Sequence, residues 1–222
     1  SNSIERVHGG VLSNSSVSMK ERSFEEVSHE QAGEKAAIGR VAAGMISSGD
    51  SIILDVGTTA TAVADALVQR KDIEDVIVFT NGITTALKLE PEIPRYTVIL
   101  MGGVLRPRQH SLVQPMSGEW LERLNANIAF IGCNGIDVDS GVTNVNVPEA
   151  HVKQMMVGAA RRVVVVADGS KLGKTSLVKF ADVDDIDVVV TTSSATDEGI
   201  EAIRSANRDV ILADNPQPAS NE

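Results

Sequence analysis

Short apolar runs alternate with segments of helical periodicity along almost the whole chain of 222 residues. Each run has the length and the Val and Ile content of a buried strand, and each ends in small or polar residues. Apolar strands that alternate with helices indicate an α/β fold, with a mostly parallel sheet covered by helices on both faces. The strands are expected at residues 52–54, 76–79, 96–101, 128–131, 163–167, 188–190 and 210–212.

The segments between these runs have the apolar spacing of amphipathic helices. A single helix is expected over residues 24–46, with Gly49 and Asp50 after its end. Further helices are expected at residues 83–89 and 149–160, and a last one ends near Ser205.

Residues 51–67 contain the most informative change from strand to helix. The apolar run ends at Asp55, the turn contains Gly57, Thr58 and Thr59, and helical spacing follows. N–H groups at a helix N-terminus have no partner within the helix, and the dipole there is positive, so such a turn suits a phosphate or carboxylate. A threonine that caps the helix with nothing bound explains the same residues, so both interpretations stay open.

Small and polar residues follow nearly every expected strand. In parallel α/β sheets, ligands bind at the carboxyl ends of the strands, where such turns meet. The sequence therefore predicts a small-molecule site at one edge of the sheet. It lacks the Gly-x-Gly-x-x-Gly spacing of dinucleotide binding, and residues 169–175 only approach a P-loop, because Asp168 stands where the first glycine belongs.

The amino-acid composition argues against several classes of function. The formal net charge of −10 and the pI of about 4.9 argue against nucleic-acid binding by this chain itself. Cys133 is the single cysteine and is expected to be a small core residue; its isolation fits a reducing cytoplasm, so cytoplasmic localisation is expected. The histidines lack metal-ligand spacing, and no apolar run approaches the roughly 18 residues of a membrane span. No metal or cofactor is expected.

Six motifs together give a more specific indication than any single turn. They are Asp55-Val-Gly-Thr-Thr59, Thr80-Asn81, Met101-Gly-Gly103, Phe130-Ile-Gly-Cys-Asn-Gly-Ile136, Glu149-Ala-His-Val-Lys153 and Ala167-Asp-Gly-Ser-Lys171. In this order they resemble the C-terminal effector-sensing domain of the DeoR/GlpR family of bacterial transcriptional repressors, from about Glu30 to Ser205. The resemblance implies a Rossmann-like α/β fold, similar to that of ribose-5-phosphate isomerase and CoA-transferase-like proteins.

The resemblance implies a ligand-sensing domain of a repressor of sugar metabolism, with a phosphorylated sugar or polyol as effector. Operator DNA is expected to be contacted only through an absent N-terminal winged helix-turn-helix domain, and the family suggests a homodimer or homotetramer. Residues 1–22 are then expected to be a linker remnant after that domain, residues 23–214 the sugar-phosphate sensor domain, and residues 215–222 a flexible tail.

The same resemblance implies which residues bind the ligand. Gly57, Thr58 and Thr59 are expected to hold the phosphate, and Glu149 and Lys171 the polar end of the sugar. The other expected site residues are Asp55, Thr80, Asn81, Gly102, Gly103, Asn134, Gly135, Asp137, Lys153 and Asp168. Simpler readings stay open: Glu149 with Lys153 fits a helix-surface pair, and Lys171 with Asp168 fits an ion pair. For Arg106 and Arg108, phosphate contact and plain solvent exposure are equally compatible with the sequence.

A sugar-phosphate isomerase is the alternative function. Isomerising an aldose to a ketose requires a carboxylate that removes a C–H proton and later returns it. The isomerase that the family resembles has an acid after its strand where this chain has Asn134, and an amide does not accept that proton. Glu149 is retained, but a binding domain that is not an enzyme is expected.

Overall fold

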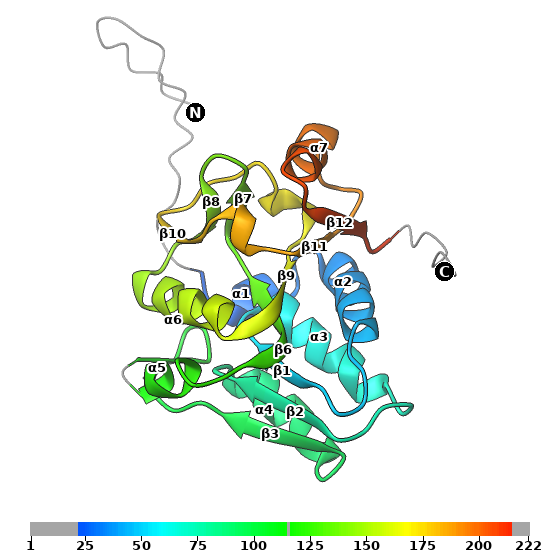
Figure 1. Cartoon of the computed structure of the whole chain (residues 1–222), viewed down its shortest axis with the longest axis vertical. Helices are drawn as coiled ribbons and strands as arrows, with labels where there is room; N and C mark the ends of the chain where they lie inside the picture. The colour runs from blue at the N-terminus through cyan, green and yellow to red at the C-terminus, as the bar shows by residue number, and fades with distance from the viewer. Residues whose placement is uncertain (1–21, 115, 215–222) are drawn as a thin grey trace, which may run out of the picture.

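A seven-stranded parallel sheet forms the centre of the computed structural model, which describes residues 22–114 and 116–214. Its strand order is β12-β11-β9-β6-β1-β2-β3 (Figure 1). Every neighbouring pair in it is parallel, which confirms the predicted α/β fold. The strands are β1 (Ser51–Leu54), β2 (Val76–Thr80), β3 (Tyr96–Leu100), β6 (Ala126–Gly132), β9 (Ala160–Val166), β11 (Val188–Thr191) and β12 (Asp209–Leu212).

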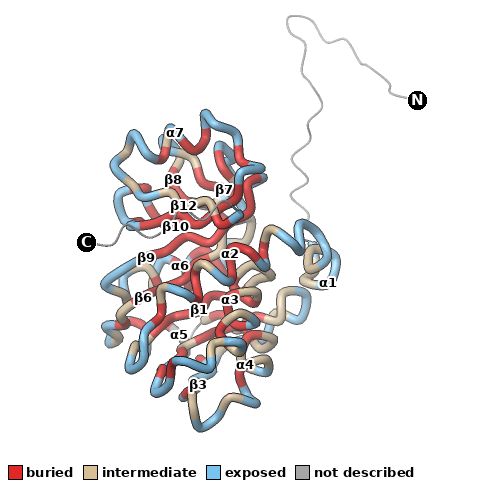
Figure 2. Tube along the Cα trace, turned by 90° about the vertical axis from the view of Figure 1, so that its right-hand side faces the viewer, coloured by how far each residue is buried: buried red, intermediate tan, exposed pale blue. Residues whose placement is uncertain are grey.

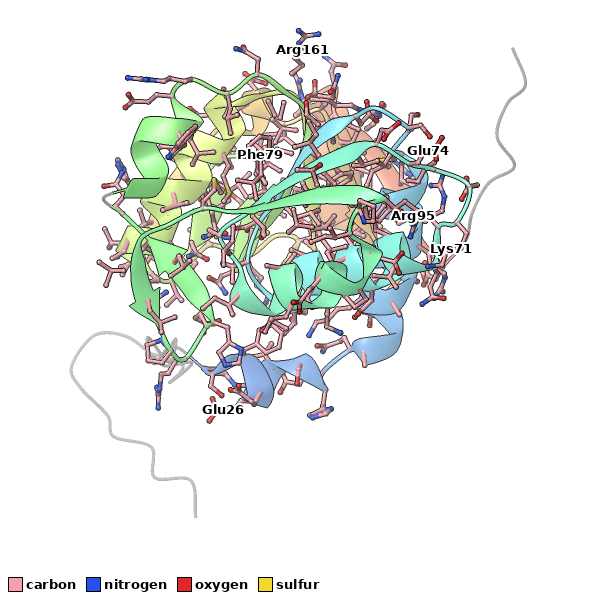
Figure 3. The ribbon with its side chains drawn as sticks, turned by 90° about the horizontal axis from the view of Figure 1, so that it is seen from below. Glu26, Lys71, Glu74, Phe79, Arg95 and Arg161 are labelled. Atoms are coloured by element: carbon pink, nitrogen blue, oxygen red, sulfur yellow. The ribbon has the colours of Figure 1, made fainter. Side chains whose placement is uncertain are left out.

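Helices pack on both faces of this sheet because its strands are apolar on both sides. Ile52 and Leu54 of β1 belong to a core shared with α2 (Ala32–Gly44), α3 (Thr58–Gln69) and α4 (Ile83–Leu89). Ile53, between them in sequence, belongs to the core on the other face, with α5 (Met116–Leu121), α6 (Val147–Gly158) and α7 (Asp197–Ser205). The central strands are accordingly buried along their length (Figure 2). Charged side chains such as those of Arg161 and Glu74 lie at the periphery (Figure 3).

Two small antiparallel sheets complete the fold, and the sequence did not predict them. One joins β4 (Val104–Arg106) to β5 (Ser111–Val113), and the other has the order β10-β8-β7. The latter strands are β7 (Gly135–Asp137), β8 (Gly141–Asn144) and β10 (Val178–Ala181). Both sheets lie beyond the carboxyl ends of central strands: β4 follows β3, and β7 follows β6.

The single helix expected over residues 24–46 is wrong. The structure has α1 (Phe24–Ser28) and a separate α2, with Gln31 at φ 45° between them. That left-handed conformation turns the chain and ends the helical path. Ser23 and Glu26 form a capping box that fixes the start of α1. The predicted linker residues 1–21 and tail residues 215–222 lie outside the described residues.

Candidate functional site

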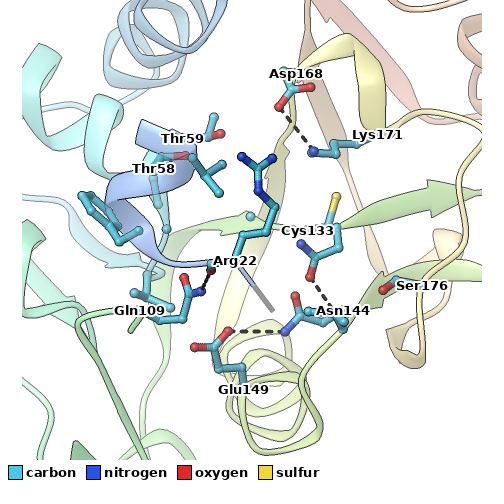
Figure 4. A pocket seen from close by; sticks show the side chains of 18 of the residues that line it. Arg22, Thr58, Thr59, Gln109, Cys133, Asn144, Glu149, Asp168, Lys171 and Ser176 are labelled. Atoms are coloured by element: carbon cyan, nitrogen blue, oxygen red, sulfur yellow. Dashed lines mark hydrogen bonds and ion pairs between the residues drawn. The ribbon is translucent and has the colours of Figure 1, made fainter. Parts of the chain in front are cut away.

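A cavity of about 300 Å³ lies beyond the carboxyl ends of β1, β6 and β9, the position that the sequence predicts for a ligand. The segments that directly follow these three strands line it, together with α6 and the segment 22–30 that contains α1 (Figure 4). Its lining combines polar and apolar surface in about equal parts and carries charges of both signs, so the arrangement of those charges decides what the cavity can bind.

The N-terminus of α3 opens into this cavity. Gly57 precedes the helix with φ 115°, a conformation in which a side chain is strained. Among the residues that the structure describes, no side chain caps this helix. Thr58 and Thr59 line the cavity and are partly exposed. The N–H groups of the first turn and two hydroxyls are therefore available to an anion at the positive end of the helix dipole.

Asp55 and Lys153 form a buried ion pair next to the cavity. Asp55 is 0 % exposed and does not line the cavity, whereas the Lys153 side chain reaches it. The Lys153 ammonium donates to the Asp55 carboxylate and, at 3.0 Å, to the Gly132 carbonyl. The Gly132 N–H donates to Asp55 at 3.0 Å. Burial raises the pKa of the Asp55 carboxyl, against the attraction of the Lys153 charge. The pair thus ties β1 and β6 to α6.

Glu149 lies on the side of the cavity away from Asp168 and Lys171 (Figure 4). The Asn146 side chain caps α6 and accepts the Glu149 N–H at 3.1 Å. The Glu149 carboxylate forms an ion pair with Arg106 and accepts the Ser111 hydroxyl at 2.8 Å and the Asn144 amide at 3.5 Å. These partners occupy three of the roughly four acceptor positions of the carboxylate and fix its orientation, so Oε2 can still accept a hydrogen bond from a ligand hydroxyl.

Lysine side chains gather on the opposite side. Lys171 has a 30 % exposed side chain, and its ammonium lies 3.9 Å from Asp168. Lys35 is 3 % exposed, and its ammonium donates to the Val27 carbonyl at 2.8 Å, a neutral acceptor. Burial lowers the pKa of Lys35. Among the described residues no carboxylate is hydrogen-bonded to this ammonium, although the Asp168 charge opposes the lowering of its pKa, so a further anion beside it is favoured.

Similarity to known proteins identifies the family to which this chain belongs. Residues 30–193 match the model of the DeoR C terminal sensor domain. The chain belongs to the DeoR sensor family. The HTH-type transcriptional regulator GlpR of Haloferax volcanii is 37 % identical over 94 % of this chain and 79 % of its own. The putative aga operon transcriptional repressor of Escherichia coli O157:H7 is 32 % identical over 93 % of this chain and 76 % of its own. The glycerol-3-phosphate regulon repressor of Escherichia coli K12 is 30 % identical over 86 % of this chain and 73 % of its own.

These relatives are named as transcriptional regulators and repressors and not as enzymes, which agrees with the predicted sensor domain of a regulator. Remote likenesses among solved structures include a probable sor operon regulator from Shigella flexneri, with TM-score 0.47 and 15 % identity over 79 % of this chain and 89 % of that one. Ribose 5-phosphate isomerase from Methanocaldococcus jannaschii has TM-score 0.44 and 14 % identity over 62 % of this chain and 52 % of that one.

The cavity of the sensor domain brings together about half of the residues that the sequence assigns to the site. Asn134 lines it and also accepts the Val145 N–H at 2.9 Å, so its amide has a structural partner as well. The predicted residues in the lining are Gly57, Thr58, Thr59, Asn134, Glu149, Lys153, Asp168 and Lys171.

Thr80 and Asn81 lie outside the lining and organise the turn after β2. The Thr80 hydroxyl accepts the Gly82 N–H at 3.0 Å. The Asn81 amide donates to the Leu112 carbonyl at 3.1 Å, while the Asn81 carbonyl accepts the Leu112 N–H at 2.8 Å. Both residues are buried. The Thr80 hydroxyl stabilises the turn itself, and the two Asn81 bonds hold the β4–β5 hairpin against the sheet.

Gly102, Gly103, Gly135 and Asp137 also lie outside the lining. A Cβ on Gly103 would lie 2.1 Å from the Val113 carbonyl oxygen, and one on Gly135 2.3 Å from that of Lys174. These two glycines therefore permit close approach between backbone segments. The Asp137 carboxylate accepts the N–H groups of Asp139 and Ser140 in the β7–β8 turn, at 3.1 and 2.9 Å.

Sequence reasoning missed the lining residues of the segment 22–30, namely Arg22, Phe24, Val27 and Glu30, and also Lys35, Gln109, Asn144 and Ser176. The sequence pattern around Lys35 could have identified it as a candidate site residue. It shares the buried face of α2 with Ile38 and Ala42, three and seven residues further on, and a lysine on an apolar stripe is unusual. The other missed residues come from segments whose contacts are distant in sequence.

Cys133 lines the cavity, and burial raises the pKa of its thiol to about 12. The thiol is therefore protonated at neutral pH and is a weak nucleophile. Within residues 22–114 and 116–214, no cluster of three or more His, Cys, Asp or Glu side chains is arranged to hold a metal ion. In the same part of the chain, no helix has the length and hydropathy needed to span a membrane.

Proposed function

We propose that this chain is the effector-binding domain of a transcriptional regulator of sugar metabolism, and that its effector is a phosphorylated sugar or polyol. The observation that carries this proposal is the division of the cavity into two parts. Thr58 and Thr59 at the N-terminus of α3, together with Lys171 opposite them and the nearby Lys35, surround the part of the cavity that lies away from Glu149 (Figure 4). Glu149 with its amide and hydroxyl neighbours lines the other part. The first part suits a phosphate and the second suits sugar hydroxyls.

The size of the cavity favours a small ligand. A volume of about 300 Å³ is at the lower end of the range for small-molecule sites. A triose, pentose or hexose monophosphate fits that range better than a dinucleotide or coenzyme A. The relative named as the glycerol-3-phosphate regulon repressor supports the same class of ligand.

The mechanism that we propose is linkage between effector and DNA. An effector that binds one arrangement of the regulator more tightly shifts the population toward it, and so changes its affinity for DNA. Operator DNA is bound by a winged helix-turn-helix domain outside this chain, with residues 1–22 as the linker, residues 23–214 as the sensor and residues 215–222 as a tail. The regulator acts in the cytoplasm as a homodimer or homotetramer.

A ligand panel tests the proposal. Thermal unfolding is followed with glycerol 3-phosphate, ribose 5-phosphate, fructose 1-phosphate and glucose 6-phosphate, and with the unphosphorylated counterparts as controls. A ligand at a hundredfold excess over Kd stabilises the fold by about 2.7 kcal/mol. We expect at least one phosphorylated compound to raise Tm and its unphosphorylated counterpart not to. Equal shifts for both, or no shift for any compound, contradict the proposal.

A substitution at the α3 terminus locates the phosphate. Thr58→Glu is expected to abolish binding of the phosphorylated compound, because a carboxylate then occupies the anion site. The fold should persist, since an acidic residue in the first turn of a helix is favourable. Thr58→Ser, which keeps the hydroxyl, is the matched control and should bind like the wild type in calorimetry. Unchanged affinity of Thr58→Glu removes this turn from the site.

A further inference from the structure

The segment of residues 22–30, here called the strap, forms one wall of the cavity. Arg22, Phe24, Val27 and Glu30 all line it. The guanidinium of Arg22 points into the space between Thr58 and Thr59 on one side and Asp168 and Lys171 on the other (Figure 4). The side chain thus reaches the part of the cavity to which we assign the phosphate, although its backbone belongs to the N-terminal end of the described chain.

Glu30 holds Arg22 in this structure. Two parallel hydrogen bonds of 2.8 and 2.7 Å join the guanidinium to the carboxylate. The two side chains are 53 % and 44 % exposed, so solvent screens the pair. A phosphate carries up to two negative charges and matches the same guanidinium geometry. An anion in the cavity is therefore a strong competitor for Arg22.

The strap is fastened to the β4–β5 hairpin, which itself contacts the cavity. The Phe24 N–H donates to the Arg108 carbonyl at 2.8 Å, and the Phe24 ring stacks on His110 with centroids 5.4 Å apart. The Gln109 amide donates to the Arg22 carbonyl. From the same hairpin, Arg106 pairs with Glu149. A continuous set of contacts therefore runs from Glu149 through the hairpin to the strap.

We propose that Arg22 is an effector-responsive residue: an anion bound at the Gly57–Thr59 turn takes its guanidinium from Glu30 and thereby secures the strap against the cavity. The inference rests on the proposed function, because it requires an anionic ligand in this cavity. Its consequence is regulatory. The strap is continuous with residues 1–21, so occupation of the cavity acts directly on the chain that leads toward the N-terminus.

Calorimetry of four variants tests this exchange of partners. The probes are inorganic phosphate and the four phosphorylated compounds of the panel, at constant ionic strength. Arg22→Ala is expected to weaken binding about tenfold or more, as for loss of a charge-assisted hydrogen bond. Glu30→Gln is expected to strengthen it about threefold, because Arg22 loses its competing partner. Lys71→Ala, which removes a positive charge from the surface pair with Glu92, is the control and should change affinity less than about twofold.

The double variant Arg22→Ala/Glu30→Gln separates partner exchange from a general effect of charge. Glu30→Gln should have no effect on affinity in the Arg22→Ala background, since its effect acts through Arg22. The same gain in both backgrounds shows simple electrostatic repulsion by Glu30 and overturns the proposal. The proposal is also overturned if Arg22→Ala binds the probe as tightly as Lys71→Ala does.

Hydrogen–deuterium exchange reports on the strap itself. In the wild type, the bound probe should slow amide exchange in residues 23–30, and in Arg22→Ala at matched saturation it should not. Saturable binding without any change in strap exchange overturns the proposal and leaves the proposed function intact. If the wild type binds none of the probes, the proposed function fails first and this inference falls with it.

Discussion

Two pairs of an aspartate and a lysine lie on either side of β6, at the carboxyl edge of the sheet, and they differ in access to solvent. Asp55, after β1, is 0 % exposed at its side chain, and its partner Lys153 is 5 % exposed. Asp168, after β9, is 3 % exposed, but its partner Lys171 is 30 % exposed and 3.9 Å away. The first lysine donates to its carboxylate and to a backbone carbonyl, whereas the second is more exposed and has room for another anion.

We propose that this difference separates a structural ion pair from a lysine that can bind the ligand. Moving both charges of a pair out of water is costly, and the buried pair repays that cost only while both partners are present. One oxygen of the Asp55 carboxylate, Oδ1, has no hydrogen-bond partner among the described atoms, so this group already depends on Lys153. The Asp168–Lys171 pair is looser, and Lys171 can change partner at small cost. Three substitutions test the distinction, in order of expected effect.

Lys153→Met should cause the largest change, a loss of about 3–5 kcal/mol in the free energy of unfolding, because it leaves a buried carboxylate without its counter-charge. Urea denaturation measures this loss. The matched control is Asp55→Asn/Lys153→Met, which removes both charges and should recover most of the stability. A loss below about 1 kcal/mol in the single variant shows that the pair is not structural.

Lys171→Ala should affect ligand affinity more than stability. We expect a loss of less than about 1 kcal/mol in stability, because the pair is partly exposed. Affinity for the phosphorylated effector should fall about tenfold or more, since a charge-assisted hydrogen bond to the ligand is lost. Calorimetry and urea denaturation of the same preparation give both values. A large loss of stability with unchanged affinity would reverse the roles of the two lysines.

The central sheet was predictable because its signal is local. Runs such as residues 163–167 are apolar throughout, and only a strand covered on both faces explains such runs between helices. Strands β4, β5 and β7 were not predicted because three residues are too few to establish a period. The break between α1 and α2 depends on the backbone of Gln31, which its residue type does not reveal.

The site was only partly predictable for the same reason. The turn at Gly57 to Thr59 is a local feature of strand, glycine and helix start, and it does line the cavity. Arg22 joins the lining through packing against Gln109, which is 87 residues further along the chain. The motif that contains Asp55 indicates the right region of the molecule. The burial of Asp55 behind Lys153 follows from the fold, and the motif does not predict it.

Lys35 extends the comparison to a third lysine, which is as buried as Lys153 but is bonded to a neutral carbonyl. Burial lowers the pKa of Lys35 in the folded protein. In the unfolded chain a lysine titrates near its ordinary value of about 10.4. Between the two pKa values the unfolded chain binds more protons than the folded one, so the free energy of unfolding rises with pH across that window.

Lys35→Met should therefore remove a destabilising term and stabilise the folded protein by about 1 kcal/mol at pH 7. Its advantage over the wild type should narrow as pH is raised toward about 10, because the wild-type lysine loses its proton more easily in the folded state than in the unfolded one. Urea denaturation at a series of pH values measures both changes. Lys71→Met, at an exposed position, is the control and should stay within about 0.5 kcal/mol of the wild type. If Lys35→Met is instead destabilised by several kcal/mol at pH 7, the Val27 carbonyl and nearby Asp168 compensate the buried charge, and Lys35 belongs with Lys153 as a structural residue.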